Sequence, residues 1–421
     1  MTWQTQATPV GSVQAPPISP REQKVKAKPG LSGRPALYLL ASLIVSLLAA
    51  SAAPTPLYAS YQAQWHFTPI TTTIVFGVYA VTVLVALLTL GRLSDYLGRK
   101  PVLLTALAIQ AVSLLVFTTA AGVPELLLAR VIQGLSTGAA LGAIGAGMLD
   151  IDRERGTFAN AVSPGMGTGT GALVSALAVR YLPAPEHLIY LVLLAVVILQ
   201  AIGVSLMRET VSRKPGGFRA LAPDVRLPRD VRGPVLAAAP VLFAVWALAG
   251  LYGALGPSLV QALTGDEDVV LGGLSLTVLT ATAVASIIAL RNTRASTVMR
   301  TGITALIVGV AVTMLALTIN SPAVFFAGTA ISGIGFGGGF QGGIRTVILL
   351  AAPRERAGVL SLLFVISYLG MGVPAVAAGF LAVHGAELTG AALYYSAALI
   401  VLGLLAAVAT GRSAKTIVID G

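Results

Sequence analysis

Long apolar segments separated by short polar links run through almost the whole chain. Twelve are predicted, with approximate bounds 36–61, 69–91, 101–121, 123–149, 157–181, 187–207, 234–262, 269–290, 301–319, 322–350, 357–383 and 389–410. A helix needs about 20 apolar residues to cross about 30 Å of hydrocarbon, and each segment is about that long or longer. The pattern therefore predicts an all-α integral membrane protein with twelve transmembrane helices.

The composition agrees with this pattern. Of the 421 residues, 56% are hydrophobic and 10% are charged, whereas a soluble domain has about 25% charged residues. The 46 glycines and 23 prolines interrupt the segments repeatedly, which spanning helices tolerate where neighbours bond the freed backbone groups. The chain has no cysteine, which excludes disulfides and cysteine-based metal sites or nucleophiles.

The positive charge follows the predicted topology. The net charge is +11, and the 27 lysines and arginines lie in the two tails and in every second link, except Arg130, Arg180 and Arg345. The positive-inside rule then predicts cytoplasmic termini in a cell membrane protein with an even number of spans. The basic excess is explained by topology and by attraction to lipid head groups, so no nucleic-acid partner is needed.

The polar stretches divide the chain into five parts. We predict a disordered cytoplasmic tail (1–33), a first six-helix half (34–207), a basic cytoplasmic linker (208–233), a second six-helix half (234–412) and a second tail (413–421). The first tail has no apolar core of its own, so it is not a signal peptide.

The two halves repeat at an offset of 201 residues. The strongest match is the Arg-Glu-Arg run, at 153–155 and again at 354–356. Other matched pairs are Pro56 with Pro257, Arg99 with Arg300, Gly134 with Gly335, Gly169 with Gly370 and Gly171 with Gly372. A fixed offset indicates duplicated structural units.

The link between the second and third segments carries a recognisable motif. Residues 91–100 read Gly-Arg-Leu-Ser-Asp-Tyr-Leu-Gly-Arg-Lys. This stretch resembles the signature loop of the major facilitator superfamily, on Gly91, Leu93, Ser94, Asp95, Gly98, Arg99 and Lys100, with Arg92 at its variable position. Tyr96 departs from the motif, which usually has a cation there.

The resemblance implies a fold and a function. Transporters of this superfamily have two six-helix halves with a substrate site near the midplane between them. We therefore expect a monomeric secondary transporter that exports a small organic molecule by alternating access, without a cofactor. The alternatives are an importer of a sugar or organic anion and a non-transporting receptor or scaffold on the same fold. An enzyme is disfavoured because no buried nucleophile and base form a pair.

Asp95 and Arg99 are one helical turn apart, so we expect them to pair at the cytoplasmic surface. We also expect Asp95 to face the start of span 11, where unpaired amides favour a negative charge. That contact would join the halves when the inner side is closed.

Arg130 is the one ionisable residue deep in a predicted span, and such residues are functional candidates by default. With Gln133 and Gly134 it resembles the span-4 motif of drug and proton antiporters, in which an arginine is proposed to take part in proton coupling. The alternative is that Arg130 extends to the membrane surface and only anchors the helix.

Protons are an open candidate for coupling. None of the sixteen acidic residues lies in the middle of a predicted span, so no carrier is obvious. Glu125, near Arg130 at the outer end of span 4, is the best candidate.

Further candidates lie inside the spans. The expected cavity residues are Tyr58, Gln133, Trp246, Tyr252, Gln341 and Tyr368, whose aromatic and amide groups favour an uncharged or amphiphilic substrate, although Arg130 would allow an anion. The residues expected to bend or pack helices are Pro54, Pro56, Pro164, Gly165, Gly167, Gly169 and Gly171, and the span-5 group partly resembles an antiporter motif. No metal site is predicted, since His66, His187 and His384 lie far apart without acidic partners.

Overall fold

The computed structural model describes residues 30–217, 221–265, 269–352, 354–385 and 387–419. Within these ranges the chain is helical and forms no β-strand, apart from an isolated bridge between Leu31 and Met207. The predicted all-α class is confirmed. Most of the tail predicted at 1–33 lies outside the described residues.

The helices follow the predicted segments closely. The first half contains α1 (Arg34–Ala52), α2 (Pro54–Trp65), α3 (Pro69–Leu90), α4 (Ser94–Leu97), α5 (Arg99–Thr118), α6 (Val123–Ile151), α7 (Arg153–Tyr181) and α8 (Pro185–Leu206). A short 3-10 turn, η2 (Arg229–Val231), precedes the second half, which contains α9 (Arg232–Ala254), α10 (Gly256–Thr264), α11 (Val269–Ala289), α12 (Ala295–Thr318), α13 (Pro322–Ile348), α14 (Arg356–Val383) and α15 (Glu387–Ile419).

Eleven helical segments in the described part of the chain are long and apolar enough to cross a membrane. The predicted span that is not among them is α7, because glycine, serine and threonine dilute its apolar character. It is nevertheless a 29-residue helix that packs against α1 and α11, as a twelfth member of the bundle. At the other extreme, α15 continues to Ile419, beyond the end predicted for the last span.

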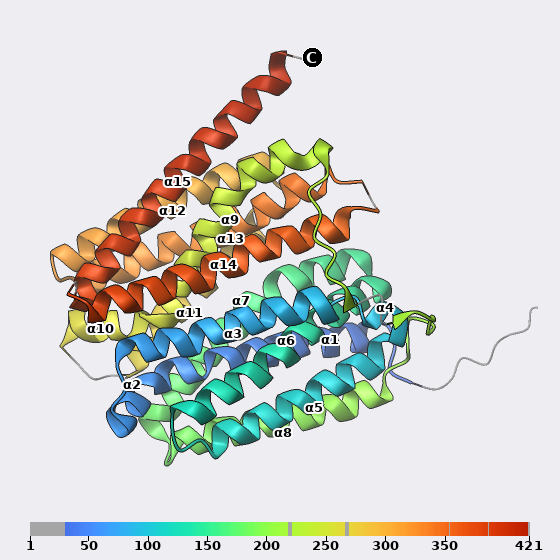
Figure 1. Ribbon diagram of the computed structural model, residues 1–421, viewed down its shortest axis with the longest axis horizontal. Coiled ribbons are helices and arrows are strands. Elements are labelled where there is room, and N and C mark those ends of the chain that lie inside the picture. Colours follow the sequence, from blue (N-terminus) through green and yellow to red (C-terminus); the bar gives the residue numbers. More distant parts are fainter. Residues whose placement is uncertain (1–29, 218–220, 266–268, 353, 386, 420–421) are drawn as a thin grey trace, which may run out of the picture.

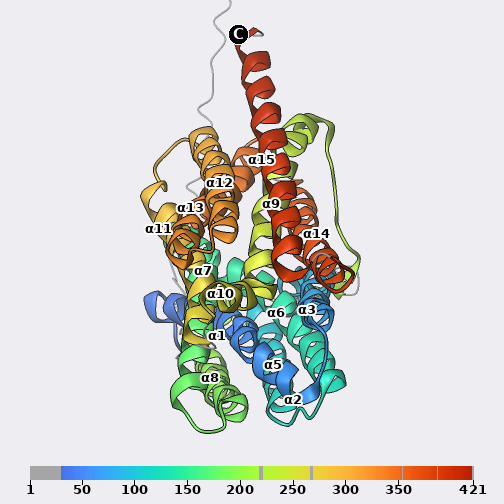
Figure 2. The ribbon, with the colours of Figure 1, turned by 90° about the vertical axis from the view of Figure 1, so that its left-hand side faces the viewer.

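Helices α1–α8 and α9–α15 form two groups that lie against each other (Figures 1 and 2). The groups meet mainly along two helix pairs, α3 with α14 and α7 with α11. Each group has its own apolar core. The end of the bundle that carries α4 and residues 91–100 is called the loop end below, and α2 and α10 lie at the opposite end (Figure 1).

The first span of each half is divided at an equivalent place. The division falls at Ala53 between α1 and α2 and at Leu255 between α9 and α10. Pro56 and Pro257, the matched prolines of the repeat, lie in the first turn of the helix that follows. Proline cannot donate a backbone hydrogen bond, so both divisions arise from the same local cause.

The glycines of α7 lie on two different faces of that helix. A Cβ atom at Gly167 would lie 2.5 Å from the carbonyl oxygen of Val45, and one at Gly171 would meet the backbone of Ala49, both in α1. A Cβ at Gly165 would lie 2.6 Å from a side-chain methyl of Val284 in α11. One face of α7 therefore packs within its own half, and the other packs against the second half.

This difference gives a prediction for matched substitutions. Gly171→Ala is expected to lower the free energy of unfolding by about 1–3 kcal/mol, because its methyl group meets backbone atoms that cannot move aside. Gly165→Ala meets the end of a side chain, which can rotate. The measurement is the thermal unfolding midpoint of each purified variant. Both substitutions raise helix propensity equally, so a difference between the midpoints reports the packing of the two faces. Equal midpoints for both variants would contradict the assignment of the faces.

Candidate functional site

Arg130 is fully buried on α6, about 10 Å along the helix from its first residue. Its Nη1 donates to the carbonyl oxygen of Ser51 (2.8 Å) and to Oε1 of Gln133 (2.8 Å). Its Nη2 donates to the hydroxyl of Tyr58 (2.6 Å). The alternative in which Arg130 extends to the membrane surface is therefore wrong, because its guanidinium is bound inside the first half.

Three aromatic rings surround the same guanidinium. Its central carbon lies 5.9 Å from the ring centroid of Tyr58, 5.2 Å from that of Tyr79 and 5.7 Å from that of Phe117. Such rings attract a cation through their negative faces. Tyr79 and Phe117 were not among the candidates, because aromatic residues are common in apolar spans and only the packing brings these two to Arg130.

The division between α1 and α2 explains why polar groups gather here. Pro54 has no N–H group to bond the carbonyl oxygen of Ala50. In its place, Nε2 of Gln133 donates to that oxygen at 3.1 Å. The hydroxyl of Ser175 donates to the carbonyl oxygen of Ala53 at 2.6 Å. Pro54 therefore leaves one buried acceptor that a side chain of α6 bonds, and a side chain of α7 adds a second hydrogen bond to the backbone at the same division.

No acidic residue in the described part of the chain pairs with Arg130. Glu125 is half-buried in the first turn of α6, five residues earlier and so about 7.5 Å away along the axis. Glu125 therefore does not pair with Arg130, and its role as a proton carrier stays a prediction. The hydrogen-bond partners that the described structure gives the guanidinium are all neutral.

A cavity of about 110 Å³ lies between the halves at the end opposite the loop end. Tyr58 lines it, so one side chain contacts both the cavity and Arg130. The other polar residues of the lining come from both halves and are neutral: Thr55, Gln62, Thr72, Ser258 and Gln261.

Trp246 and Tyr368 come together at the interface of the halves. Their ring centroids are 4.7 Å apart, and Trp246 also contacts Phe340 at 5.5 Å. Tyr368 belongs to the same apolar cluster as Tyr79 of α3. Tyr79, which lies beside Arg130, and Tyr368, which lies beside Trp246, thus belong to one apolar cluster where the halves meet.

The last two cavity candidates lie elsewhere. The hydroxyl of Tyr252 is within hydrogen-bond distance of Thr313 and Thr329, inside the core of the second half, and not at the cavity. Gln341 lies on α13, and its Oε1 is a buried atom without a hydrogen-bond partner among the described residues. Neither residue is brought to Arg130.

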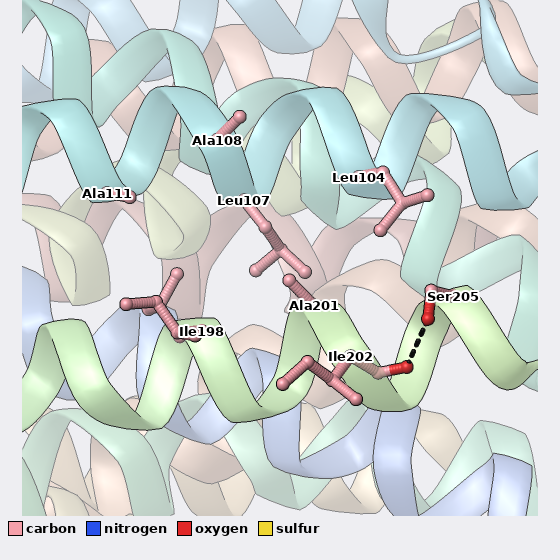
Figure 3. A pocket seen from close by; sticks show the side chains of 9 residues that line it. Leu104, Leu107, Ala108, Ala111, Ile198, Ala201, Ile202 and Ser205 are labelled. Atoms are coloured by element: carbon pink, nitrogen blue, oxygen red, sulfur yellow. Dashed lines mark hydrogen bonds between the residues drawn. The ribbon is translucent and has the colours of Figure 1, made fainter.

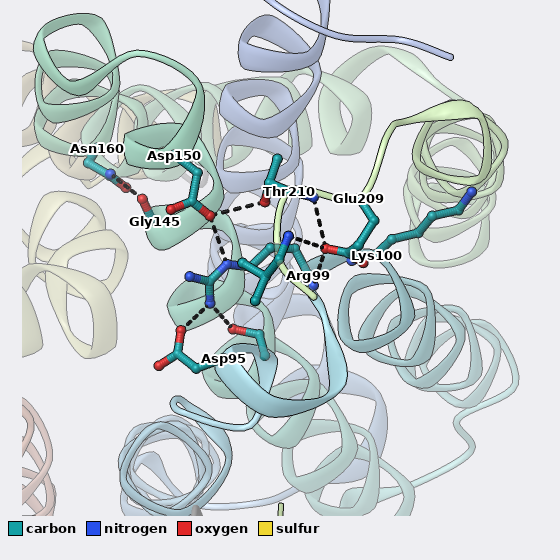
Figure 4. A network of polar contacts seen from close by, with 10 residues as sticks. Asp95, Arg99, Lys100, Gly145, Asp150, Asn160, Glu209 and Thr210 are labelled. Atoms are coloured by element: carbon teal, nitrogen blue, oxygen red, sulfur yellow. Dashed lines mark hydrogen bonds and ion pairs between the residues drawn. The ribbon is translucent and has the colours of Figure 1, made fainter. Parts of the chain in front are cut away.

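A second polar group occupies the loop end (Figure 4). Arg99 is almost fully buried and pairs with Asp95, as expected. It also binds Asp150 at the end of α6, with 3.1 Å between Nε and Oδ2. The signature loop is therefore fixed to α6 as well as to itself.

Glu209 of the linker caps the helix that follows the signature loop (Figure 4). Its two carboxylate oxygens accept hydrogen bonds from the backbone N–H groups of Arg99 (2.8 Å) and Lys100 (2.9 Å). Gly98 has φ +98°, and a Cβ there would lie 2.7 Å from Glu209. Glycine is thus required both by the backbone and by the cap. Sequence analysis missed Glu209, although its position directly after span 6 was a signal.

The expected contact between Asp95 and the start of span 11 does not occur in the described residues. At the loop end, residues of the linker connect the two halves instead. Arg92 pairs with Asp224, with 3.3 Å between Nη1 and Oδ2. Arg226 also pairs with Asp224, and its N–H donates to the carbonyl oxygen of Gly358 in α14 (3.2 Å). Asp224 carried no sequence signal, because nothing marks it among the three acidic residues of the linker.

A groove of about 340 Å³ on the outside of the first half lies between α5 and α8 (Figure 3). Ser205 is its one polar lining residue, and the Ser205 hydroxyl is bonded to the backbone of Ile202 (2.6 Å). The groove does not face the second half, so it is not a candidate for a site between halves.

The three histidines are exposed and apart. Nδ1 of His187 lies 2.7 Å from the carbonyl oxygen of Thr118, and His66 ends α2. Over the described ranges no three histidine or acidic side chains gather as a metal site would require.

Solved transporter structures resemble this fold at low sequence identity. The nucleoside transporter NupG aligns with a TM-score of 0.68 and 13% identity over 89% of this chain and 98% of its own. A bacterial homologue of the human lysosomal transporter Spinster aligns with a TM-score of 0.69 and 14% identity over 91% and 97%. The human organic anion transporter MFSD10 aligns with a TM-score of 0.62 and 18% identity over 88% and 98%. These likenesses concern the fold alone.

Sequence comparison leads to the same family. A stretch of 74 residues is 42% identical to an uncharacterized transporter of Rickettsia bellii (strain RML369-C), and it spans 17% of this chain and 18% of that relative. Residues 38–303 match the Major Facilitator Superfamily, across the first half, the linker and part of the second half. Together with the signature loop and the two-half bundle, this match means that the chain belongs to the major facilitator superfamily of transporters.

Proposed function

We propose that this protein is a secondary active transporter that exports a small organic molecule, a drug or a metabolite, by alternating access. The observation that carries the proposal is Arg130, a buried ionisable residue whose partner Tyr58 lines a cavity between the halves. Polar groups inside a membrane bundle mark substrate or ion pathways. Export is supported by the resemblance of Arg130, Gln133 and Gly134 to the span-4 motif of antiporters.

The alternatives are an importer and a non-transporting receptor. The solved relatives include a nucleoside transporter and an organic anion transporter, so kinship favours no single substrate or direction. A receptor has no need for a loop that fastens one half to the other by way of separable ion pairs, which supports a protein that cycles.

We further propose that the loop end is cytoplasmic, with both termini on that side, as the distribution of lysine and arginine favours. Arg92, Asp224 and the N–H of Arg226 then form a latch between the signature loop and α14 on the cytoplasmic side. Contacts made in one state only bias the equilibrium toward that state. The latch therefore favours the state that is closed to the cytoplasm.

The proposal is tested by transport in proteoliposomes. Labelled drugs, sugars and organic acids are offered with and without a pH gradient, and both uptake and efflux are measured. Export predicts substrate movement that a pH gradient accelerates if protons couple. Absence of flux for every compound, with the protein correctly inserted, would favour the receptor.

Arg130→Ala is expected to abolish transport while the chain still inserts. The substitution removes the guanidinium, which donates hydrogen bonds to Tyr58 and Gln133 and holds both side chains in place. Arg130→Lys should restore little, because an ammonium group does not replace a planar guanidinium. Substrate flux is the measurement, and size-exclusion chromatography of each variant is the control for folding. Flux equal to wild type in Arg130→Ala would remove this residue from the mechanism.

Asp224→Asn is expected to shift the resting population toward the inward-open state, more than Asp95→Asn does. Asp224 pairs with Arg92 and Arg226, whereas Asp95 pairs with Arg99 inside the same half. One cysteine near the end of α3 and one near the start of α14, introduced into this cysteine-free chain, report the separation by cross-linking.

Asp224→Glu keeps the charge and serves as the matched control, with cross-linking close to wild type. Cross-linking that is unchanged in Asp224→Asn would mean that the linker is only a tether. A larger effect of Asp95→Asn than of Asp224→Asn would mean that the signature loop controls the conformational equilibrium without Asp224.

A further inference from the structure

The charge of Arg130 has no opposite charge paired with it among the described residues. An arginine side chain stays protonated, and this one is fully buried. Its partners are a hydroxyl, an amide oxygen and a carbonyl oxygen, which carry no net charge. Burying an ion is costly unless an opposite charge compensates it.

The chain itself cannot supply the missing charge at this depth. None of the sixteen acidic residues of the sequence lies in the middle of a predicted span. In the described ranges the acidic residues lie at helix ends or in links, as Glu125, Glu186 and Glu387 do in the first turns of α6, α8 and α15. A compensating negative charge at Arg130 must therefore come from outside the chain.

We infer that the substrate is a small organic anion whose carboxylate pairs with Arg130. This inference rests on the proposed transport function and specifies its substrate class. The expectation of an uncharged or amphiphilic substrate was based on six aromatic and amide residues. Of these, Tyr58 lines the cavity, whereas the others do not: Gln133, Trp246, Tyr252, Gln341 and Tyr368.

The free donor of the guanidinium fits a carboxylate. Carboxylates bind arginine through two parallel N–H groups, and one such pair is formed by Nε and Nη2. The Nε atom is buried without a hydrogen-bond partner in the described structure, and Nη2 is bonded to the hydroxyl of Tyr58. If the Tyr58 hydroxyl moved away, the N–H groups of both Nε and Nη2 would be free to bind a carboxylate.

Tyr58 also provides the route. It is part of the cavity lining, so rotation of this side chain would join the cavity to the guanidinium. The remaining polar lining, which includes Thr55, Gln62 and Gln261, can hydrogen-bond an organic anion without repelling it. The rings of Tyr79 and Phe117 beside Arg130 provide apolar contact for the carbon skeleton of the anion.

The test compares benzoate with benzamide, its neutral analogue of nearly the same shape, using the full-length purified protein. Acetate and lactate complete the panel of carboxylates. Binding is measured as the ligand-dependent rise of the thermal unfolding midpoint, and transport is measured with labelled benzoate in proteoliposomes. Wild type is expected to bind benzoate and not benzamide. Arg130→Gln is expected to bind benzoate at least about 30-fold more weakly, as when one member of a buried charge pair is truncated.

A second variant tests the charge and keeps the arginine. Gln133→Glu places a carboxylate where Oε1 now accepts from Arg130 at 2.8 Å, so the variant carries its own counterion. It also loses the bond to Ala50, and its midpoint without ligand is therefore not the readout. The expected result is loss of the benzoate effect. Gln200→Glu is the matched control, since Gln200 is another buried glutamine of the same half, bonded to Ser46 and Ser42, and it should respond to benzoate like wild type.

Several results would overturn the inference. These are equal stabilisation by benzoate and benzamide, a benzoate effect that survives in Arg130→Gln or in Gln133→Glu, and no stabilisation of wild type by any carboxylate of the panel. Flux of neutral compounds, with no carboxylate changing either binding or flux, would support the proposed transport function and contradict the anionic substrate. Benzoate that binds through Arg130 but never crosses the membrane would support the anion site and contradict transport.

Discussion

Backbone polar groups inside a bilayer must find hydrogen-bond partners within the protein. At the division between α1 and α2 the helix itself does not supply all of them. Pro54 removes a donor from the first span, and Gln133 bonds the carbonyl oxygen that is left free. Arg130 bonds the neighbouring carbonyl of Ser51. The same groups that complete the helix therefore build the polar centre of the first half, so their structural role and the function proposed for them lie in one cluster.

That cluster is connected to the second half by aromatic packing. Tyr79 contacts Arg130 and shares a cluster with Tyr368, which in turn contacts Trp246. The halves also approach closely where α7 and α11 pack through small residues. A ligand that moved Tyr58 or Tyr79 would thus act on the interface between the halves, and this would link binding to the proposed change of state.

At the loop end the linker is a structural element. Glu209 caps α5, while Asp224 and Arg226 connect Arg92 to α14. Residues far apart in sequence meet there because the linker crosses from one half to the other. The signature loop is consequently one part of a larger polar assembly, and the charges that hold the halves together lie partly outside the motif.

The sequence alone determined the helical class and the pairing of Asp95 with Arg99, because hydrophobic length and neighbouring positions on a helix are local properties. It also predicted the two halves and their repeat. It also singled out Arg130, Gln133 and Tyr58, since polar groups in apolar spans are rare. Only the tertiary structure decided that Glu125 does not pair with Arg130, that Tyr252 lies in a core, and that Asp224 replaces Asp95 between the halves. These contacts depend on how helices rotate and pack against one another, and periodicity within a single span carries no information about its neighbour.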